Sequence, residues 1–191
     1  MQHAAHQEGA RLHVLADPAQ KNSLADLIAE GDRLQGADAR FRRELAAWIH
    51  PNRGRSRDGI PGYAQGVGEL LSVLGPFVVR TFDWGGGQAA RDRQLAEGSP
   101  VLLVLSTEED AALAHLAAGQ ALDRVLLTAT AYGLSASFLN QPVEVPTLRP
   151  KVARLIGARH PQLVLRLGYG PNVPPAPRRP ARAVRSTNKY L

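Results

Sequence analysis

The pattern of apolar and polar residues in the first fifty positions predicts one strand followed by two helices. Residues 10–16, ARLHVLA, alternate as a short strand does. Residues 17–36 place Pro18 near a helix start. Residues 37–50 keep a helical spacing that stops before Pro51, because the residue preceding a proline is disfavoured in the α region. The predicted apolar stripes are Leu24, Leu27, Ile28 and Leu34 in the first helix, and Phe41, Leu45, Trp48 and Ile49 in the second.

The clearest strand of the chain is predicted at residues 101–107, VLLVLST. This uninterrupted apolar run is typical of a strand that is covered on both faces. A long helix over residues 108–133 follows, with alanine and leucine on nearly every face, so we expect a buried helix at the centre of the core. Thr107 is its expected N-cap and Gly133 its expected left-handed stop.

The remaining segments alternate between strand and helix. Residues 76–82 favour a strand, the glycines at 85–87 a break, and residues 88–100 a short polar helix or a disordered excursion. The second half continues as strand, helix and strand at 134–139, 145–157 and 161–170. The predicted fold class is therefore α+β, a layered fold in which a central sheet is flanked by helices.

The loop at residues 50–68 is a functional candidate. It holds five glycines and two prolines beside Arg53, Arg55 and Arg57. Glycine-rich and proline-rich loops of this length are uncommon unless they serve as lids or binding loops. We therefore expect a lid-like loop within a domain over residues 1–173.

The positive charge of the chain is concentrated at its C-terminal end. The whole sequence has 23 basic and 17 acidic residues, whereas the proline-containing tail at 174–191 has five basic residues and no acid. The body over 1–173 is thus nearly neutral. The tail lacks the interleaved aromatic residues that stack on bases, so nucleic acid is not an expected partner, although a contact with another anion stays open. Its basic residues are Arg178, Arg179, Arg182, Arg185 and Lys189.

Composition excludes several classes of protein. The sequence has no cysteine, which excludes disulfide frameworks, thiolate zinc sites and cysteine nucleophiles. No window approaches the uninterrupted apolar stretch that a membrane helix needs, and the N-terminus lacks the pattern of a signal peptide. We therefore expect a soluble, cytoplasmic protein with no membrane contact.

Three motifs favour ordinary structural roles. The glycines at 85–87 lack the spacing of a phosphate-binding loop, which favours a flexible connection. His3 and His6 have no third ligand nearby, so no metal site is expected. Asp110 and His115 lack the GxSxG elbow that would present a serine nucleophile, so a serine hydrolase is not expected.

The order of motifs in the second half resembles a known family. Residues 119–180 contain a helix of the form G-x-A-x-x-x-x-L-L-x-A-x-x-x-G-L, a strand, a short helix, a strand ending in L-G-Y, and a proline-spaced arginine. This order is similar to the C-terminal half of the FMN-dependent nitroreductase superfamily. The segments ELAAWI, RDGIPGYAQGVG, LAAGQALDRVLLTAT and NQPVEVPTLR resemble its Acg-type branch, and the resemblance spans nearly all of residues 5–185.

The resemblance implies an FMN-binding flavoprotein that passes two electrons from NAD(P)H to a nitro or quinone-type small-molecule acceptor. It also implies a homodimer or a complementing N-terminal lobe, while catalytic residues stay unassigned. The residues that would line the flavin ring are Ser135, Ala136, Phe138, Leu139, Asn140 and Gln141, and Arg178 or Arg179 would meet the phosphate. Short polar side chains near the ring and an arginine at the phosphate suit flavin chemistry.

The chain departs from the family pattern at two places. The usual Gln-Asn pair of the long helix is replaced by Asp123 and Arg124. The N-terminal Arg-x-Ser-x-Arg element is absent, since RGRSRDG at 53–59 lies in mid-chain. Three hypotheses stay open, namely an FMN-dependent enzyme, a truncated or non-catalytic flavin-sequestering module, and a nucleic-acid binder that uses its basic tail. Asn140 and Gln141 either face the flavin or close their own turn.

Overall fold

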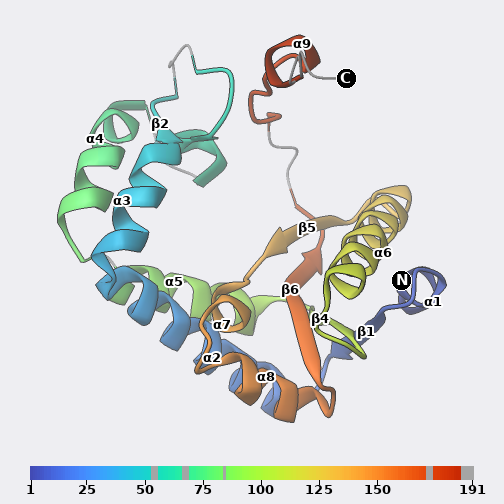
Figure 1. Ribbon diagram of the computed structural model, residues 1–191. Helices are drawn as coiled ribbons and strands as arrows, with labels where there is room; N and C mark the ends of the chain where they lie inside the picture. Colours follow the sequence, from blue (N-terminus) through green and yellow to red (C-terminus); the bar gives the residue numbers. More distant parts are fainter. Residues whose placement is uncertain (53–55, 66–68, 84, 171–173, 186–191) are drawn as a thin grey trace. The chain divides into compact units, whose positions relative to one another are not determined.

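The chain folds into two compact units, each built from segments that are distant in sequence. A computed structural model describes residues 1–52, 56–65, 69–83, 85–170 and 174–185 (Figure 1). Unit 1 consists of residues 1–37 and 84–171, and unit 2 of residues 38–83 and 172–191.

Unit 1 is organised around a four-stranded antiparallel sheet in the order β1-β4-β6-β5. The strands are β1 (Arg11–Leu15), β4 (Val101–Thr107), β5 (Ser135–Phe138) and β6 (His160–Gly168). The apolar run at 101–107, predicted to be covered on both faces, forms β4. It pairs with β1 along one edge and with β6 along the other, and it is buried from Leu102 to Thr107. The strands predicted at 10–16, 101–107, 134–139 and 161–170 are confirmed.

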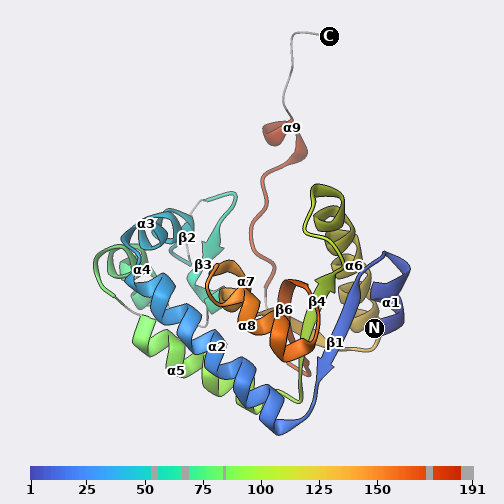
Figure 2. The same cartoon turned by 60° about the horizontal axis from the view of Figure 1, so that its bottom comes forward.

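Helices cover both faces of this sheet, as Figure 2 shows. On one face lie α1 (Gln2–Gln7) and α6 (Ala112–Ala131). On the other lie α2 (Pro18–Ala37), α5 (Gly85–Gly98) and α8 (Arg149–Ile156), with the short helix α7 (Gln141–Glu144) against α2 and α8. The predicted α+β class, a sheet flanked by helices, is confirmed.

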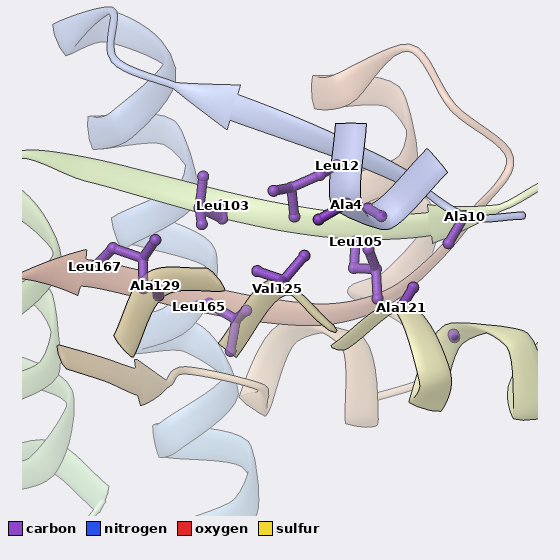
Figure 3. Packing of buried hydrophobic residues seen from close by; sticks show 12 residues of the cluster. Ala4, Ala10, Leu12, Leu103, Leu105, Ala121, Val125, Ala129, Leu165 and Leu167 are labelled. Carbon is purple, nitrogen blue, oxygen red and sulfur yellow. The ribbon is translucent and has the colours of Figure 1, made fainter. Parts of the chain in front are cut away.

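Alternate residues of β4 feed two separate apolar cores, one on each face of the sheet. Leu103 and Leu105 join the core beneath α1 and α6, shown in Figure 3, whereas Leu102 and Val104 join the core beneath α2 and α8. Full burial of one such side chain contributes roughly 1.5–3 kcal/mol. Apolar residues are therefore required at successive positions from Leu102 to Leu105, which explains the lack of alternation there.

The long helix α6 is less buried than its composition suggests. Its buried residues form one stripe of small side chains: Ala118, Ala121, Val125 and Ala129. Leu113 and Leu127 are 82% and 72% exposed. The expectation of a helix buried on nearly every face is therefore wrong, because α6 covers one face of the sheet and turns its other side outward.

The start of α6 also differs from the prediction, while its end agrees. Thr107 belongs to β4, and its hydroxyl donates to the carbonyl oxygen of Glu109 (2.7 Å) instead of capping a helix. The helix begins at Ala112, without a side-chain cap at Ala111. Gly133 has φ +70° just beyond the last turn, the left-handed conformation that glycine adopts without strain. The predicted stop is confirmed.

Residues 76–81 are helical, so the strand predicted at 76–82 is wrong. They form the second half of α4 (Glu69–Thr81), which contains Pro76. The apolar residues Val73, Leu74, Phe77 and Val78 follow the i, i+1, i+4, i+5 spacing of a helix, which outweighs the strand preference of the paired valines. The glycines at 85–87 form the first turn of α5, not a flexible break.

Unit 2 is a small assembly of helices and short strands. The predicted second helix is α3 (Ala39–Trp48), which Asp38 caps by accepting from the backbone N–H of Arg40 (2.7 Å), and it packs against α4. A parallel pair of two-residue strands, β2 (Ile49–His50) and β3 (Ile60–Pro61), a 3-10 turn η1 (Gly62–Gln65) and α9 (Ala181–Val184) complete it. The lid-like role of the 50–68 loop stays a prediction, since residues 53–55 and 66–68 lie outside the described residues.

The described part of the chain holds neither a membrane-spanning helix nor a group of metal-binding side chains. No helix there is both long enough and apolar enough to cross a membrane. Within the same residues, no three histidine or acidic side chains gather closely enough to hold a metal ion.

Helix α7 packs closely on α2 at a glycine. A methyl group at Gly31 would lie 2.7 Å from Cβ of Gln141 and 3.0 Å from its carbonyl carbon. We therefore expect Gly31→Ala to lower the free energy of unfolding by about 1–3 kcal/mol, measured by urea denaturation. Gly119→Ala is the control, because a methyl group there meets nothing within 4 Å, and it should raise stability by about 0.4–1 kcal/mol. Equal effects at the two sites would contradict this packing.

Candidate functional site

The segment predicted to face a flavin begins on the open edge of the sheet. Strand β5 is the last strand in the order β1-β4-β6-β5 and pairs only with β6 within that sheet. Ser135 and Ala136 are exposed, Phe138 is 49% exposed, and Ser137 is partly buried. The strand therefore presents two hydroxyl groups and an apolar surface along an edge that no other strand of the sheet covers.

Leu139, the next residue, lies in the interior. It is 3% exposed and belongs to the core cluster beneath α2 and α8. Its backbone N–H donates to the carbonyl oxygen of Val164 (2.9 Å), which continues the pairing with β6 by one bond. The chain thus turns inward where β5 ends.

The side chain of Asn140 completes this inward turn. Its Oδ1 accepts from the backbone N–H of Val164 (2.9 Å), on the buried strand β6. A buried backbone N–H without an acceptor is costly, so the side chain supplies the acceptor that β5 no longer offers. Asn140 therefore closes the connection between β5 and α7, one of the two roles that the sequence leaves open.

Gln141 points into unit 1 and reaches two acids. Its Nε2 donates to Oδ1 of Asp32 on α2 (3.0 Å) and to Oδ2 of Asp92 on α5 (2.9 Å). Gln88 donates to the other oxygen of Asp92 (2.9 Å). The amide groups of Asn140 and Gln141 are thus hydrogen-bonded within the protein, which leaves Ser135, Ala136 and Phe138 as the exposed members of the predicted ring-facing set.

The two buried acids were not singled out by the sequence analysis. Asp32 is 2% exposed and Asp92 is 6% exposed. A usable signal existed for Asp32, because it follows Leu24 and Ile28 at the i, i+4, i+8 spacing of the buried stripe of α2. An acid on such a stripe needs a polar partner from another element, and here that partner is Gln141.

A second polar cluster joins β4, α6, α8 and β6. Arg149 holds Asp110 with two hydrogen bonds, from Nη1 to Oδ2 (2.7 Å) and from Nη2 to Oδ1 (2.8 Å). His115 contacts Oδ1 of Asp110 (2.8 Å), and Gln162 also donates to it (3.2 Å). These bonds, led by Arg149, hold the pKa of the Asp110 carboxyl well below its usual range. The cluster fixes the loop that enters α6.

The arginines predicted to meet a phosphate lie in unit 2. Arg179 donates from Nε to Oδ2 of Asp58 (2.8 Å). Arg178 donates only to the carbonyl oxygens of Ala176 (3.4 Å) and Pro177 (3.2 Å) and has no acidic partner among the described residues. The strand and the arginines of the predicted site therefore belong to different units. Of the two arginines, Arg178 is the one whose charge is not already paired.

Comparisons with known proteins identify the relatives of this chain. No family model matches it. The Mycobacterium tuberculosis protein named "Putative NAD(P)H nitroreductase Rv3131" is 36% identical over 148 residues, which cover 74% of this chain and 42% of the relative. The protein of the same organism named "Putative NAD(P)H nitroreductase acg" is 42% identical over 84 residues, or 41% of this chain and 25% of that protein. The chain is a relative of the Acg-type nitroreductases. It spans less than half the length of these curated relatives.

Solved structures agree with the nitroreductase fold. The structure of oxidised iodotyrosine deiodinase bound to FMN and 3-iodo-L-tyrosine superposes with a TM-score of 0.55 at 14% identity, covering 98% of this chain and 84% of that chain. The FMN- and NADPH-dependent nitroreductase NfnB from Sphigopyxis sp. strain HMH has a TM-score of 0.55 at 18% identity, covering 93% and 79%. The family resemblance and the nitroreductase-like fold predicted from the sequence are both confirmed.

Asn140 and Ser135 should respond differently to substitution if the turn is closed as described. Asn140→Leu removes the acceptor of the Val164 N–H, so we expect a loss of about 1–3 kcal/mol in the free energy of unfolding. Ser135→Ala alters an exposed position and should change stability by less than about 0.5 kcal/mol. Urea denaturation of both variants tests this difference. Wild-type stability in Asn140→Leu would show that its side chain is not needed to close the turn.

Proposed function

We propose that this chain is an FMN-binding oxidoreductase of the nitroreductase kind, which transfers two electrons from NAD(P)H to a nitro or quinone-type acceptor. The observation that carries the proposal is the 36% identity over 148 residues to a protein named as an NAD(P)H nitroreductase. The exposed edge at β5 supports it, because it offers a suitable surface at the position predicted from the family pattern.

The exposed donors of β5 fit a flavin. FMN, when bound, supplies the two-electron chemistry itself, so the protein has to hold the ring, donate hydrogen bonds and exclude water. The hydroxyl groups of Ser135 and Ser137, on one face of the strand, can donate to ring acceptors, and Ala136 with Phe138 provides an apolar surface on the other face. Hydroxyl donors held on a strand favour negative charge at the acceptor atoms, because they need no reorientation when that charge develops.

Arg178 is the candidate partner of the phosphate. Its guanidinium is exposed and faces no acid in the described part of the chain, whereas Arg179 is paired with Asp58. An arginine can grip a phosphate with two parallel hydrogen bonds. The phosphate role therefore suits Arg178 better than Arg179.

A non-catalytic flavin-binding module of the same fold is the second candidate. It is favoured by an internal departure from the family pattern, since Asp123 and Arg124 stand where the family has its Gln-Asn pair. A second copy of the chain or a complementing lobe would supply the rest of the cleft. Such a module would bind FMN without turning over.

Titration of the full chain with FMN and with riboflavin tests the proposed site. Arg178→Gln removes a charge-assisted contact worth roughly 1.5–3 kcal/mol, which corresponds to about a tenfold to hundredfold loss in FMN affinity. Riboflavin has no phosphate, so its affinity should not change. Arg182→Gln is the matched control, since Arg182 is also exposed and lies on α9.

Three outcomes separate the candidates. Bleaching of the bound flavin by anaerobic NADPH, followed by recovery of its colour with a quinone, supports the enzyme. Flavin binding without bleaching supports the non-catalytic module. A chain that takes up neither FMN nor riboflavin overturns both.

A further inference from the structure

A buried cluster of two acids and one amide holds the start of α7 against α2 and α5. The amide nitrogen of Gln141 lies 3.0 Å from Oδ1 of Asp32 and 2.9 Å from Oδ2 of Asp92. Both acids are almost completely buried. Two neighbouring carboxylates in such a site are unfavourable when both are ionised, because their charges repel and neither is solvated.

Two oxygen atoms of this cluster have no hydrogen-bond donor among the described residues. They are Oδ2 of Asp32 and Oε1 of Gln141, and both are shielded from solvent. Buried acceptors are normally satisfied, so two in one cluster require an explanation. A proton on Oδ2 of Asp32 would turn that atom from an acceptor into a donor, and Oε1 of Gln141 is the unsatisfied acceptor of the same cluster that could receive it.

The hydrogen bonds select Asp32, not Asp92, as the protonated acid. Asp92 is already satisfied as a carboxylate, since Oδ1 accepts from Gln88 and Oδ2 accepts from Gln141. If the Gln141 amide were rotated by half a turn, Oε1 would face the carboxyl oxygens of Asp32 and Asp92. Three hydrogen-bond acceptors would then lie together without a donor. The orientation with Nε2 toward both acids therefore agrees with a neutral Asp32 and an ionised Asp92.

The surrounding charges point the same way. Burial, and then the negative charge of Asp92 on α5, raises the pKa of Asp32 to about 7, against the opposing effects of the Gln141 hydrogen bond and of Arg33. Arg33 is exposed and also pairs with Glu30 (3.2 Å). On α7, the carboxylate of Glu144 accepts from Gln35 (2.8 Å).

We propose that Asp32 carries this proton in weakly acidic solution, and that its paired acid and amide hydrogen bonds with Gln141 anchor α7 and the end of β5 to the helical layer. Asp32 is a positioning residue, because it acts through Gln141 on the exposed strand Ser135–Phe138. The effect of the anchor on flavin binding rests on the proposed function, whereas the protonation itself does not.

Infrared spectroscopy of the full chain tests the protonation directly. The wild type at about pH 6 should show the carbonyl band of a protonated carboxyl group, since exposed acids are ionised there. Asp32→Asn should remove the band. Asp123→Asn, which changes an exposed acid on α6, should keep it. Absence of the band in the wild type, or its survival in Asp32→Asn, would overturn the proposal.

The pH dependence of stability gives a second test. Because the pKa of Asp32 is raised on folding, the folded chain holds a proton that the unfolded chain has lost between about pH 4 and 7, so its contribution to stability falls as the pH rises through that range. Asp32→Asn supplies an N–H to Gln141 at every pH. The ratio of its unfolding constant to that of the wild type should therefore fall by up to about tenfold for each unit that the pH rises across this range, and stay constant above it.

A ratio of unfolding constants that does not change with pH would overturn the proposal. Asp123→Asn should keep the wild-type pH profile. The link to flavin binding is tested separately, by FMN titration at about pH 8. At that pH the wild-type Asp32 has lost its proton, whereas Asp32→Asn still has an N–H for Gln141, so the variant should bind FMN more tightly than wild type. If the infrared and stability results hold and no variant binds FMN, the anchor stands and the proposed function fails.

Discussion

Burial of β4 on both faces is the constraint on which the rest of unit 1 depends. A strand with apolar side chains on both sides is stable only when helices cover both faces of its sheet. Leu103 and Leu105 need the layer formed by α1 and α6, and Leu102 and Val104 need the layer formed by α2, α5 and α8. With β4 and β6 in the centre, β5 is left at the edge, where Ser135, Ala136 and Phe138 stay exposed.

The candidate site combines an exposed strand with a buried polar support. The strand offers hydroxyl groups and an apolar surface, as a flavin requires. Directly after it, Leu139, Asn140 and Gln141 turn inward, where one packs in the core and the other two bond to β6, α2 and α5. A rigid turn of this kind fixes the strand without using the side chains that face outward. Short polar residues are therefore crowded between 135 and 141 for two reasons. Ser135 and Ser137 belong to the open edge strand, whereas Asn140 and Gln141 bond to β6, α2 and α5 inside the unit.

The expectations that failed share a physical cause. Composition made α6 look buried all round, yet its small residues form one stripe and Leu113 and Leu127 face outward. Paired valines made residues 76–82 look extended, yet the spacing of Val73 and Phe77 is helical. Thr107 had the chemistry of an N-cap, yet pairing with β6 keeps it in a strand. In each case a single local signal was outweighed, either by the spacing of the wider segment or by pairing with another strand.

The sequence by itself determined the elements with strong periodicity, the α+β class, the placement of charge in the tail and the family to which the chain is related. These properties are local, because they depend on residue types and on spacings of a few positions. Tertiary structure alone decided that Asn140 bonds to β6 and that Gln141 bonds to Asp32 and Asp92. It also decided that Arg179 pairs with Asp58, while Arg178 has no acidic partner among the described residues. Such contacts join residues as distant in the sequence as Asp58 and Arg179, and a spacing pattern carries no information about them until the chain has folded.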